Sequence, residues 1–238
     1  MSETPKNNGV LGICIFLGLV AFGYILSNTA IKYKEYERTV TVKGLSEREL
    51  KADIVIWPIR FTAASNDLAK LYEAIESNTS EINKLLTSKG IPVKEISVGS
   101  PSITDKLAQQ YGTNQKAEFR YTAFQTVTVY SKRVGPVREL MSSLSELGKK
   151  GIVFSGVNYQ EKTEYIFTKL NEIKPEMIEE ATKKAREVAQ RFATDSQSKL
   201  GKIKRATQGQ FSIKPRDKNN SHIKKVRVVS TVEYYLSD

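Results

Sequence analysis

The sequence predicts an α+β fold in which one N-terminal transmembrane helix precedes an antiparallel-sheet domain with about three main helices. The first observation behind this prediction is an apolar run from Val10 to Leu26. The second is a series of segments whose apolar residues alternate, and the third is a set of segments whose apolar residues recur every three or four positions. With 39% apolar and 26% charged residues, the remainder is expected to be globular.

The apolar run is long enough to cross a bilayer. Its 17 apolar or glycine residues, extended through the more tolerant Ser27 to Ile31, provide about 22 positions and roughly 33 Å of helix. We therefore expect residues 10–31 to form a transmembrane signal anchor. Residues 1–9 are then a short polar tail, and residues 32–38 are a linker to the domain.

Three other interpretations compete with an anchor. A cleaved secretory signal would place Ala30 before the cut, but Asn28 then occupies a position that prefers a small residue. A lipoprotein signal would use Cys14, but Ile13 stands where such signals need glycine or alanine. A buried core helix is disfavoured because the run is apolar on every face. The uncleaved anchor is favoured, and cleavage is the main alternative.

Two signals for the direction of the anchor conflict. Lys6 precedes the helix and Lys32, Lys34 and Arg38 follow it, which favours a cytoplasmic carboxyl side. A very short polar tail before an apolar run instead resembles a signal anchor whose amino terminus stays inside. We adopt this second orientation as a hypothesis. A reporter fused after Asp238, active only outside the cytoplasm, would test it.

The domain is expected to begin with a hairpin. Thr39 to Glu49 is rich in strand-forming residues, and Asp53 to Ala63 places alternate apolar side chains on one face. A turn or bulge at Lys51 and Ala52 would join the two strands. Pro58 has no backbone donor, so its strand is expected at a sheet edge or with a bulge there.

Further strands complete the predicted antiparallel sheet. Residues 95–104 and 118–131 are expected to form a long hairpin around a polar tip, and residues 153–163 form another strand. The last two strands are predicted over residues 203–213 and 226–236, the final one with strict alternation.

Three amphipathic helices are predicted among these strands. The first spans Asp67 to Lys89, and the second spans Val137 to Leu147 with Pro136 in its first turn. The third and longest starts at Pro175 and is closed by Gly201. Its expected inner face consists of Ile178, Ala181, Ala185, Val188, Ala189, Phe192 and Leu200.

Charge and cysteine content narrow the classes of function. Cys14 is the only cysteine and lies in the membrane segment, so the domain has no disulfide and no thiol chemistry. The net charge of +11 suits solubility and attraction to anionic head groups more than specific nucleic-acid binding, because no nucleic-acid motif accompanies it. The basic clusters lie at Lys183, Lys184 and Arg186, at Lys202, Lys204 and Arg205, and at Lys214 to Lys225.

No combination of residues indicates catalysis. His222 is the only histidine and lies in a loop, which makes a catalytic triad or a zinc site improbable. Gly148 to Gly151 lacks the Lys-Ser/Thr ending of a phosphate-binding loop. Paired glutamates more often belong to a surface pattern than to acid and base catalysis, and the pairs are Glu179 with Glu180 and Glu47 with Glu49. We therefore expect no enzyme, no cofactor, no metal and no catalytic residue.

Aromatic residues are expected mainly in the core, because aromatics on strands usually pack inward. One segment is different, since Lys106 to Lys116 is a polar hairpin tip that could present Tyr111 to a neighbouring subunit. The aromatic residues considered as a binding platform are Trp57, Tyr72, Tyr111, Tyr121 and Phe124.

Several short motifs occur in a specific order over about 200 residues. The opening strand VTVKGLSERELKA, Val40 to Ala52, resembles the form V-x-G-x-G/A-x-x-x-V-x-A-D, from which Lys43 and Leu45 depart. The other motifs are Gly90-Ile91-Pro92 before Ile96, the strand Tyr121 to Val129, Gly151 to Val157 with its Ser155-Gly156-Val157, the helix Ala181 to Gly201, and the closing strand. Together they resemble the SIMPL domain family. An uncleaved anchor in place of the usual secretory signal suggests a membrane-anchored branch.

The resemblance implies an α+β fold, an extracytoplasmic location and, in some members, homo-oligomers in the form of large rings or cages. It also implies a loose link to oxidative stress, and it implies no known reaction. We therefore expect a single-pass protein of a bacterial inner membrane whose SIMPL domain, residues 39–238, lies in the periplasm. Its division into two lobes, residues 39–165 and 166–238, is an alternative.

The expected function is non-enzymatic: self-assembly into a large homo-oligomer that supports envelope integrity or oxidative-stress tolerance. The alternative is a monomeric binding module for an anionic envelope ligand. The expected partners are further copies of the chain and the bilayer through residues 10–31. Anionic lipid head groups are a further candidate partner, and no specific nucleic acid is expected.

Overall fold

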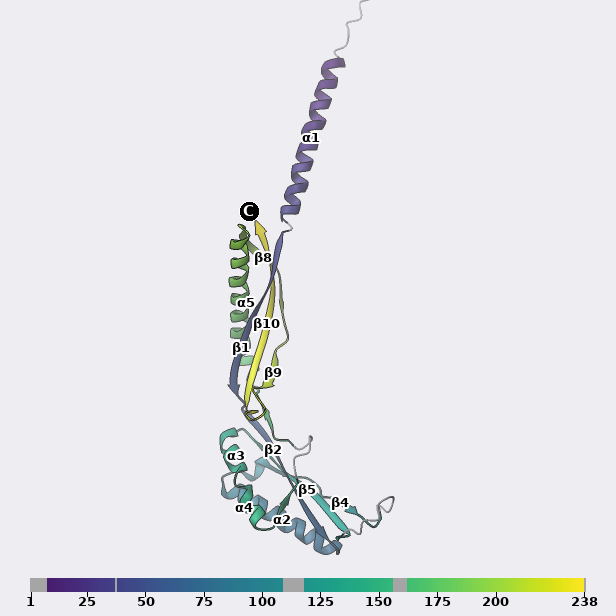
Figure 1. Cartoon of the computed structure of the whole chain (residues 1–238), viewed down its shortest axis with the longest axis vertical. Coiled ribbons are helices and arrows are strands. Elements are labelled where there is room, and N and C mark those ends of the chain that lie inside the picture. Colours follow the sequence, from purple (N-terminus) through teal and green to yellow (C-terminus); the bar gives the residue numbers. More distant parts are fainter. Residues whose placement is uncertain (1–7, 37, 109–117, 156–161, 238) are drawn as a thin grey trace, which may run out of the picture. The chain divides into compact units, whose positions relative to one another are not determined.

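The computed structural model describes residues 8–36, 38–108, 118–155 and 162–237. Their contacts divide the chain into two compact units, each built from segments distant in sequence (Figure 1). Unit 1 contains residues 1–47, 174–212 and 227–238, and unit 2 contains residues 48–173 and 213–226. The sequence suggested one boundary near residue 165, whereas each unit here needs both the early and the late parts of the chain.

Helix α1 (Asn8–Tyr36) is the N-terminal apolar helix. Within it, Gly12–Thr29 is long and apolar enough to cross a membrane, and its side chains are exposed. Thr29 Oγ1 donates to the Ile25 carbonyl at 2.7 Å, so this hydroxyl is satisfied within the helix. The helix therefore suits a single membrane span or a signal sequence.

Unit 1 is built on a sheet with the strand order β1-β10-β8, in which β9 also pairs with β10. The strands are β1 (Thr39–Lys51), β8 (Lys199–Gln208), β9 (Ser212–Pro215) and β10 (Ile223–Ser237). β10 is antiparallel to β8, with Thr231 opposite Thr207. As predicted, alternate residues of β10 are buried: Val226, Val228, Ser230, Val232 and Tyr234.

Helix α5 (Leu170–Asp195) runs along β1 and β10 (Figure 1). Its fully buried residues recur every four positions: Met177, Ala181, Ala185, Ala189 and Ala193. The predicted inner face was partly wrong, because Val188 and Phe192 are 37% and 55% exposed. The alanine face lies against the sheet because only small side chains allow so close an approach. The larger side chains of α5 therefore lie on its outer face.

The ends of the long helix also differ from the prediction. Pro175 lies inside α5 and does not start it. The helix ends at Asp195, where Gln197 adopts a positive φ of 56° and Ser198 N–H donates to the Ala193 carbonyl at 2.8 Å. Gly201 is not a cap, because it lies within β8, where an added Cβ would come 3.0 Å from the Tyr235 carbonyl oxygen.

Unit 2 is built on a six-stranded sheet with the order β3-β5-β2-β6, in which β4 pairs with β5 and β7 pairs with β2. The strands are β2 (Ile54–Ser65), β3 (Ile96–Val98), β4 (Ser102–Asp105), β5 (Tyr121–Ser131), β6 (Val153–Phe154) and β7 (Glu164–Ile166). β3 and β4 together form the predicted hairpin with β5. Of the predicted strand 153–163, the described part contains only the two-residue β6, and β7 begins just after its predicted end; residues 156–161 lie outside the described residues.

The helices of unit 2 are α2 (Leu68–Ser88), the short 3₁₀ turn η1 (Val93–Glu95), α3 (Val134–Met141) and α4 (Leu144–Lys149). α2 begins at Asp67, whose carboxylate accepts from the Ala69 and Lys70 amides, and ends before Gly90 with its φ of 87°. Pro136 lies in the first turn of α3, as predicted. These helices and the sheet enclose a core that includes Trp57, Phe61, Leu71, Ile82, Leu86, Val127, Val137 and Leu147.

The predicted hairpin of the first two strands was wrong, because β1 and β2 belong to different sheets. Between them, the Ala52 amide donates to the His222 carbonyl at 2.8 Å and the Asp53 amide to the Ile166 carbonyl at 2.9 Å. The backbone at this junction is thus paired with later segments, so the chain continues without reversing.

Pro58 was expected at an edge or a bulge, and this was wrong for the strand as a whole. β2 pairs with β5 from Val55 to Ser65 without a register shift. On its other side β2 pairs with β7 up to Ile56 and with β6 only from Phe61. Pro58 lies opposite this interval, in which no described strand needs its missing donor.

Candidate functional site

The candidate site is the sheet of unit 1, because its packing against α5 is tight on one face and its other face and both edges are uncovered by the described residues. Gly44 of β1 fixes this packing. An added Cβ there would lie 1.8 Å from the Ala181 carbonyl oxygen and 2.5 Å from the Ala185 nitrogen. Backbone therefore contacts backbone, and a residue larger than glycine has no space.

A partly buried hydrogen bond joins β1 and α5 beside this contact. Ser46, which is fully buried, donates through its hydroxyl to Glu180 Oε2 at 2.9 Å. The other oxygen of Glu180 accepts from Lys184 at 2.6 Å. Glu180, weighed in the sequence with Glu179 as a pair of carboxylates and judged a surface pattern, has a partner on each oxygen, and this leaves it poorly suited to acid and base chemistry.

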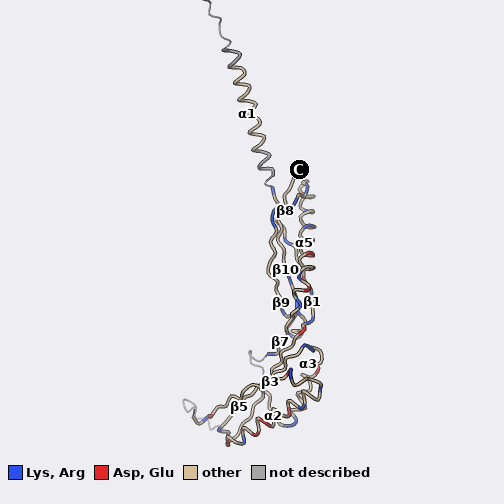
Figure 2. The backbone as a smooth tube through the Cα atoms, turned by 180° about the vertical axis from the view of Figure 1, so that it is seen from behind, with Lys and Arg blue, Asp and Glu red and all other residues tan. Residues whose placement is uncertain are grey.

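The face of the sheet opposite α5 carries polar and basic side chains, and Figure 2 marks the Lys and Arg positions along the strands in blue. Lys204 of β8 forms an ion pair with Glu233 of β10 at 3.3 Å, and its ammonium lies 5.7 Å from the centre of the Tyr235 ring. Tyr235 is 39% exposed. The odd-numbered residues of β1 on this face, including Lys43 and Leu45, are exposed.

The two outer strands of the same sheet have open edges. Among the described strands, β1 and β8 each pair only with β10. β1 has 13 residues and β8 has 10, whereas strands in globular proteins usually have about five or six. Each edge is a row of backbone donors and acceptors that another strand can use.

The remaining residues considered for catalysis do not come together. Among the described residues, the ring of His222 is hydrogen-bonded to no carboxylate, and it lies edge-on to Tyr165 with the ring centres 6.0 Å apart. Burial lowers the pKa of His222, and the positive charges of Arg138 and Arg216 lower it further. No group of three or more His, Cys, Asp or Glu side chains in the described part of the chain is arranged to hold a metal ion.

The aromatic residues divide between core and surface. Trp57 lies in the core of unit 2 and Tyr121 packs partly against it, as expected. Phe124 lies on the other face of the sheet, with the Arg60 guanidinium 4.4 Å above its ring. Tyr72 is exposed, and Tyr111 with most of the predicted hairpin tip lies outside the described residues. These positions do not form one aromatic platform.

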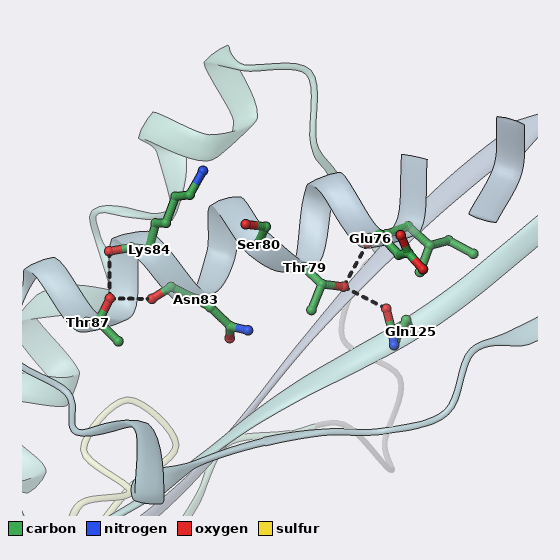
Figure 3. Close-up of a pocket in the computed structure, with 8 residues that line it drawn as sticks. Glu76, Thr79, Ser80, Asn83, Lys84, Thr87 and Gln125 are labelled. Carbon is green, nitrogen blue, oxygen red and sulfur yellow. Dashed lines mark hydrogen bonds between the residues drawn. The ribbon is translucent and has the colours of Figure 1, made fainter. Parts of the chain in front are cut away.

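Unit 2 carries an open groove of about 460 Å³ beside α2 (Figure 3). Two of its hydroxyls are engaged internally, because Thr79 donates to Gln125 at 2.8 Å and Thr87 donates to the Asn83 carbonyl at 2.8 Å. The amide nitrogen of Gln125 donates to the Gly99 carbonyl at 2.8 Å. Since the protein already uses these groups, the groove is a weaker candidate than the sheet of unit 1.

Comparison with protein families gives a match over residues 40–232 to the SIMPL family, described as a protein of unknown function (DUF541). The chain belongs to the SIMPL family. The match covers both units, so the SIMPL domain includes the close-packed sheet of unit 1 as well as the groove of unit 2. A search of curated proteins gave no match.

The sequence interpretation missed the role of Gly44 and the alanine positions of α5. Two signals were available: a glycine inside a strand, which often marks a close backbone approach, and alanines repeated at every fourth position of one helix. Neither signal identifies the other element as its partner, so only the folded SIMPL domain brings them together.

Proposed function

We propose that this chain is a membrane-anchored, non-enzymatic SIMPL protein that assembles with copies of itself through the open edges of β1 and β8. The observation that carries the proposal is the presence, on one sheet, of two long edges that no described strand covers. Natural proteins normally shorten, cover or interrupt such edges, because an exposed edge pairs with other chains. A 13-residue edge strand therefore suits a protein whose edge is used.

The direction of the strands favours contact between unlike edges. β8 is antiparallel to β10, and β1 is also antiparallel to it, since the Leu236 amide donates to the Arg38 carbonyl and the Ala52 amide to the His222 carbonyl. β1 and β8 therefore run the same way. Pairing β8 of one copy beside β1 of the next would be a parallel, head-to-tail contact, which closes into a ring when the rotation allows.

The charges favour the same choice. β8 carries four basic residues and no acidic one, whereas β1 carries both signs. Two β8 edges side by side would place like charges opposite one another, which is destabilising. A β8 edge beside β1 avoids this repulsion.

The anchor is compatible with a head-to-tail arrangement. α1 ends at Tyr36 and β1 begins at Thr39, so the start of β1 follows the membrane helix closely. In a head-to-tail ring all β1 strands start at the same end, and all anchors enter one bilayer. In an antiparallel pair of β1 edges the anchors would leave opposite ends of a strand about 43 Å long, at roughly 3.3 Å per residue.

Particle mass tests the assembly. The mass of the detergent-solubilised protein, corrected for bound detergent, is expected to correspond to two or more copies of the 26.7 kDa chain. A particle of one chain would overturn the proposal.

Disulfide trapping tests the edges. In a Cys14→Ser background, Thr207→Cys on β8 is combined in turn with Thr41→Cys, Lys43→Cys or Leu45→Cys on β1. Within one chain β10 separates these positions by about 9 Å, or two strand spacings, which is too far for a disulfide. Oxidation of at least one pair should yield covalent ladders. An oligomeric particle without ladders for any pair would place the contact elsewhere. Thr207→Cys alone is the control and should not form ladders.

The cellular part of the proposal is a single-pass location in a bacterial inner membrane, with the domain in the periplasm and a role in envelope integrity or oxidative-stress tolerance. Support comes from the apolar helix and from what resemblance to the family implies. A periplasm-dependent reporter fused after Asp238 should be active. Cells lacking the protein should be more sensitive to peroxide or detergent, and equal sensitivity would contradict the role.

A further inference from the structure

One end of unit 1 is held close to the membrane helix by chain continuity. The Leu236 amide donates to the Arg38 carbonyl at 2.9 Å, and Arg38 is separated from the end of α1 by one residue. Ser237 of β10 lies opposite Lys199, the first residue of β8. The start of β1, the end of β10 and the start of β8 therefore meet at this end of the sheet (Figure 1).

The last turns of α5 lie at the same end. Val42, near the start of β1, packs in one cluster with Ala185 and Ala189, and Leu200 of β8 packs against that cluster. Because α5 continues from there to Asp195, its final residues lie over the end of the sheet that follows the anchor. We call this the anchor-side end of unit 1.

The distance to the bilayer is short. From Ile31, the last position of the expected span, to Tyr36 the helix rises only about 8 Å at 1.5 Å per residue, and Arg38 follows after one residue. The head-group layer of a leaflet is roughly 5 to 8 Å thick. Arg38 therefore lies at about the outer limit of the head groups, and the anchor-side end meets them when the sheet leans towards the bilayer.

The side chains at this end combine exposed apolar groups with basic ones. Phe192 is 55% exposed, Ile203 is 48% exposed and Tyr235 is 39% exposed. Arg191 and Lys202 beside them are exposed. The acidic residues nearby are Glu187 and Asp195, each four positions from Arg191 on the helix, and Glu233, which pairs with Lys204. Partly inserted apolar side chains surrounded by Lys and Arg are the usual composition of a surface that binds anionic membranes.

These side chains lie on both faces of the sheet. Tyr235 and Lys204 lie on the face opposite α5, whereas Phe192 lies on the helix that covers the other face. A protein partner that covers one face would leave the other uncovered. A flat surface that meets the sheet end-on contacts both faces together.

We propose that the anchor-side end of unit 1 binds the head groups of anionic phospholipids in the membrane that holds α1. The surface consists of Arg191, Phe192, Lys202, Ile203 and Tyr235. Lys and Arg attract the phosphates, and the apolar side chains enter the interface. The contact fixes the domain relative to the bilayer.

Hydrogen exchange of the full chain in nanodiscs tests the proposal. One preparation contains only phosphatidylcholine and the other is rich in phosphatidylglycerol. Amides from Val188 to Arg205 are expected to exchange more slowly in the anionic discs, and added salt should remove the difference. Equal exchange in both lipids would overturn the proposal.

Charge reversal provides the matched control. Arg191→Glu with Lys202→Glu should remove the added protection, since each basic residue near an anionic surface contributes roughly a fivefold factor. Lys183→Glu with Lys218→Glu changes the net charge equally at exposed positions outside the surface and should retain the protection. Equal loss in both variants would show a net-charge effect and overturn the site.

Two further measurements keep the result independent of folding and of assembly. If the reversed variant melts earlier than wild type, Phe192→Ser replaces it, because the exposed ring contributes little to the core. Loss of protection in this variant supports the surface, and unchanged protection opposes it. Particle mass is measured in the same samples, so a monomeric protein with lipid-dependent protection contradicts only the edge pairing.

Discussion

Replacing Gly44 with alanine is the most direct test of the packing that defines unit 1. The added Cβ would lie 1.8 Å from the Ala181 carbonyl oxygen, and ordinary contact begins at 3.4 Å, so α5 must move outward by about 1.6 Å. The obstructing atoms are helix backbone, which cannot rotate away as a side chain does. Movement of the helix would also separate the sheet from the buried alanines that now contact it.

We expect Gly44→Ala to lower the free energy of unfolding by about 3 kcal/mol or more, at the upper end of the cost of overpacking. That is a large share of the roughly 5 to 15 kcal/mol that stabilises a domain. For a domain of this size it corresponds to a fall in melting temperature of roughly 6 to 12 °C. Calorimetry and denaturant titration of the detergent-solubilised chain measure the loss, and hydrogen exchange of α5 localises it.

Gly148→Ala is the control, because no atom lies within 4 Å of the added Cβ and the residue is in a helix. It should leave stability unchanged or raise it by up to about 1 kcal/mol. A Gly44→Ala protein as stable as the control would refute the close contact between β1 and α5.

Three other predictions test individual contacts. Phe192→Ser should change the free energy of unfolding by less than about 0.5 kcal/mol, whereas Ala185→Leu should lower it by about 2 kcal/mol or more. Denaturant titrations measure both. The reverse order would mean that the helix face predicted from spacing is the buried one. Ser46→Ala should cost about 1 to 3 kcal/mol, because it removes a hydrogen bond to the charged Glu180, and a neutral result would contradict that bond. Hydrogen bonds from neighbouring donors lower the pKa of Asp217 from 3.8 to about 2. The stability that its carboxylate contributes is therefore complete above pH 3.8 and is lost as the pH falls towards 2. An NMR titration of this carboxyl group with a midpoint near 3.8 would contradict the prediction.

The local elements followed from the sequence where one physical pattern dominates. An apolar run without polar interruption predicted the helix that contains Gly12–Thr29, and strict alternation predicted β10 with its buried even-numbered residues. The family also followed from short motifs in order, since the match covers residues 40–232. Each of these signals lies within a contiguous segment and needs no knowledge of a partner.

The pairing of the elements did not follow from the sequence. β1 and β2 are adjacent in the chain, yet their partners are β10 and β5, because backbone groups at the junction are used by His222 and Ile166. Periodicity placed Phe192 on the inner face of α5 because it weighs apolar character alone. Steric fit decided otherwise.

The sequence alone therefore determined the apolar helix, the α+β class, the order of most strands and helices, and the family. Tertiary structure decided which face of α5 is buried, since a glycine in β1 admits only alanine-sized neighbours at backbone contact. It also decided that β1 and β8 are the outer strands of one sheet. A strand becomes an edge when no other segment pairs with one of its sides. That depends on pairings between distant segments, which local composition does not reveal.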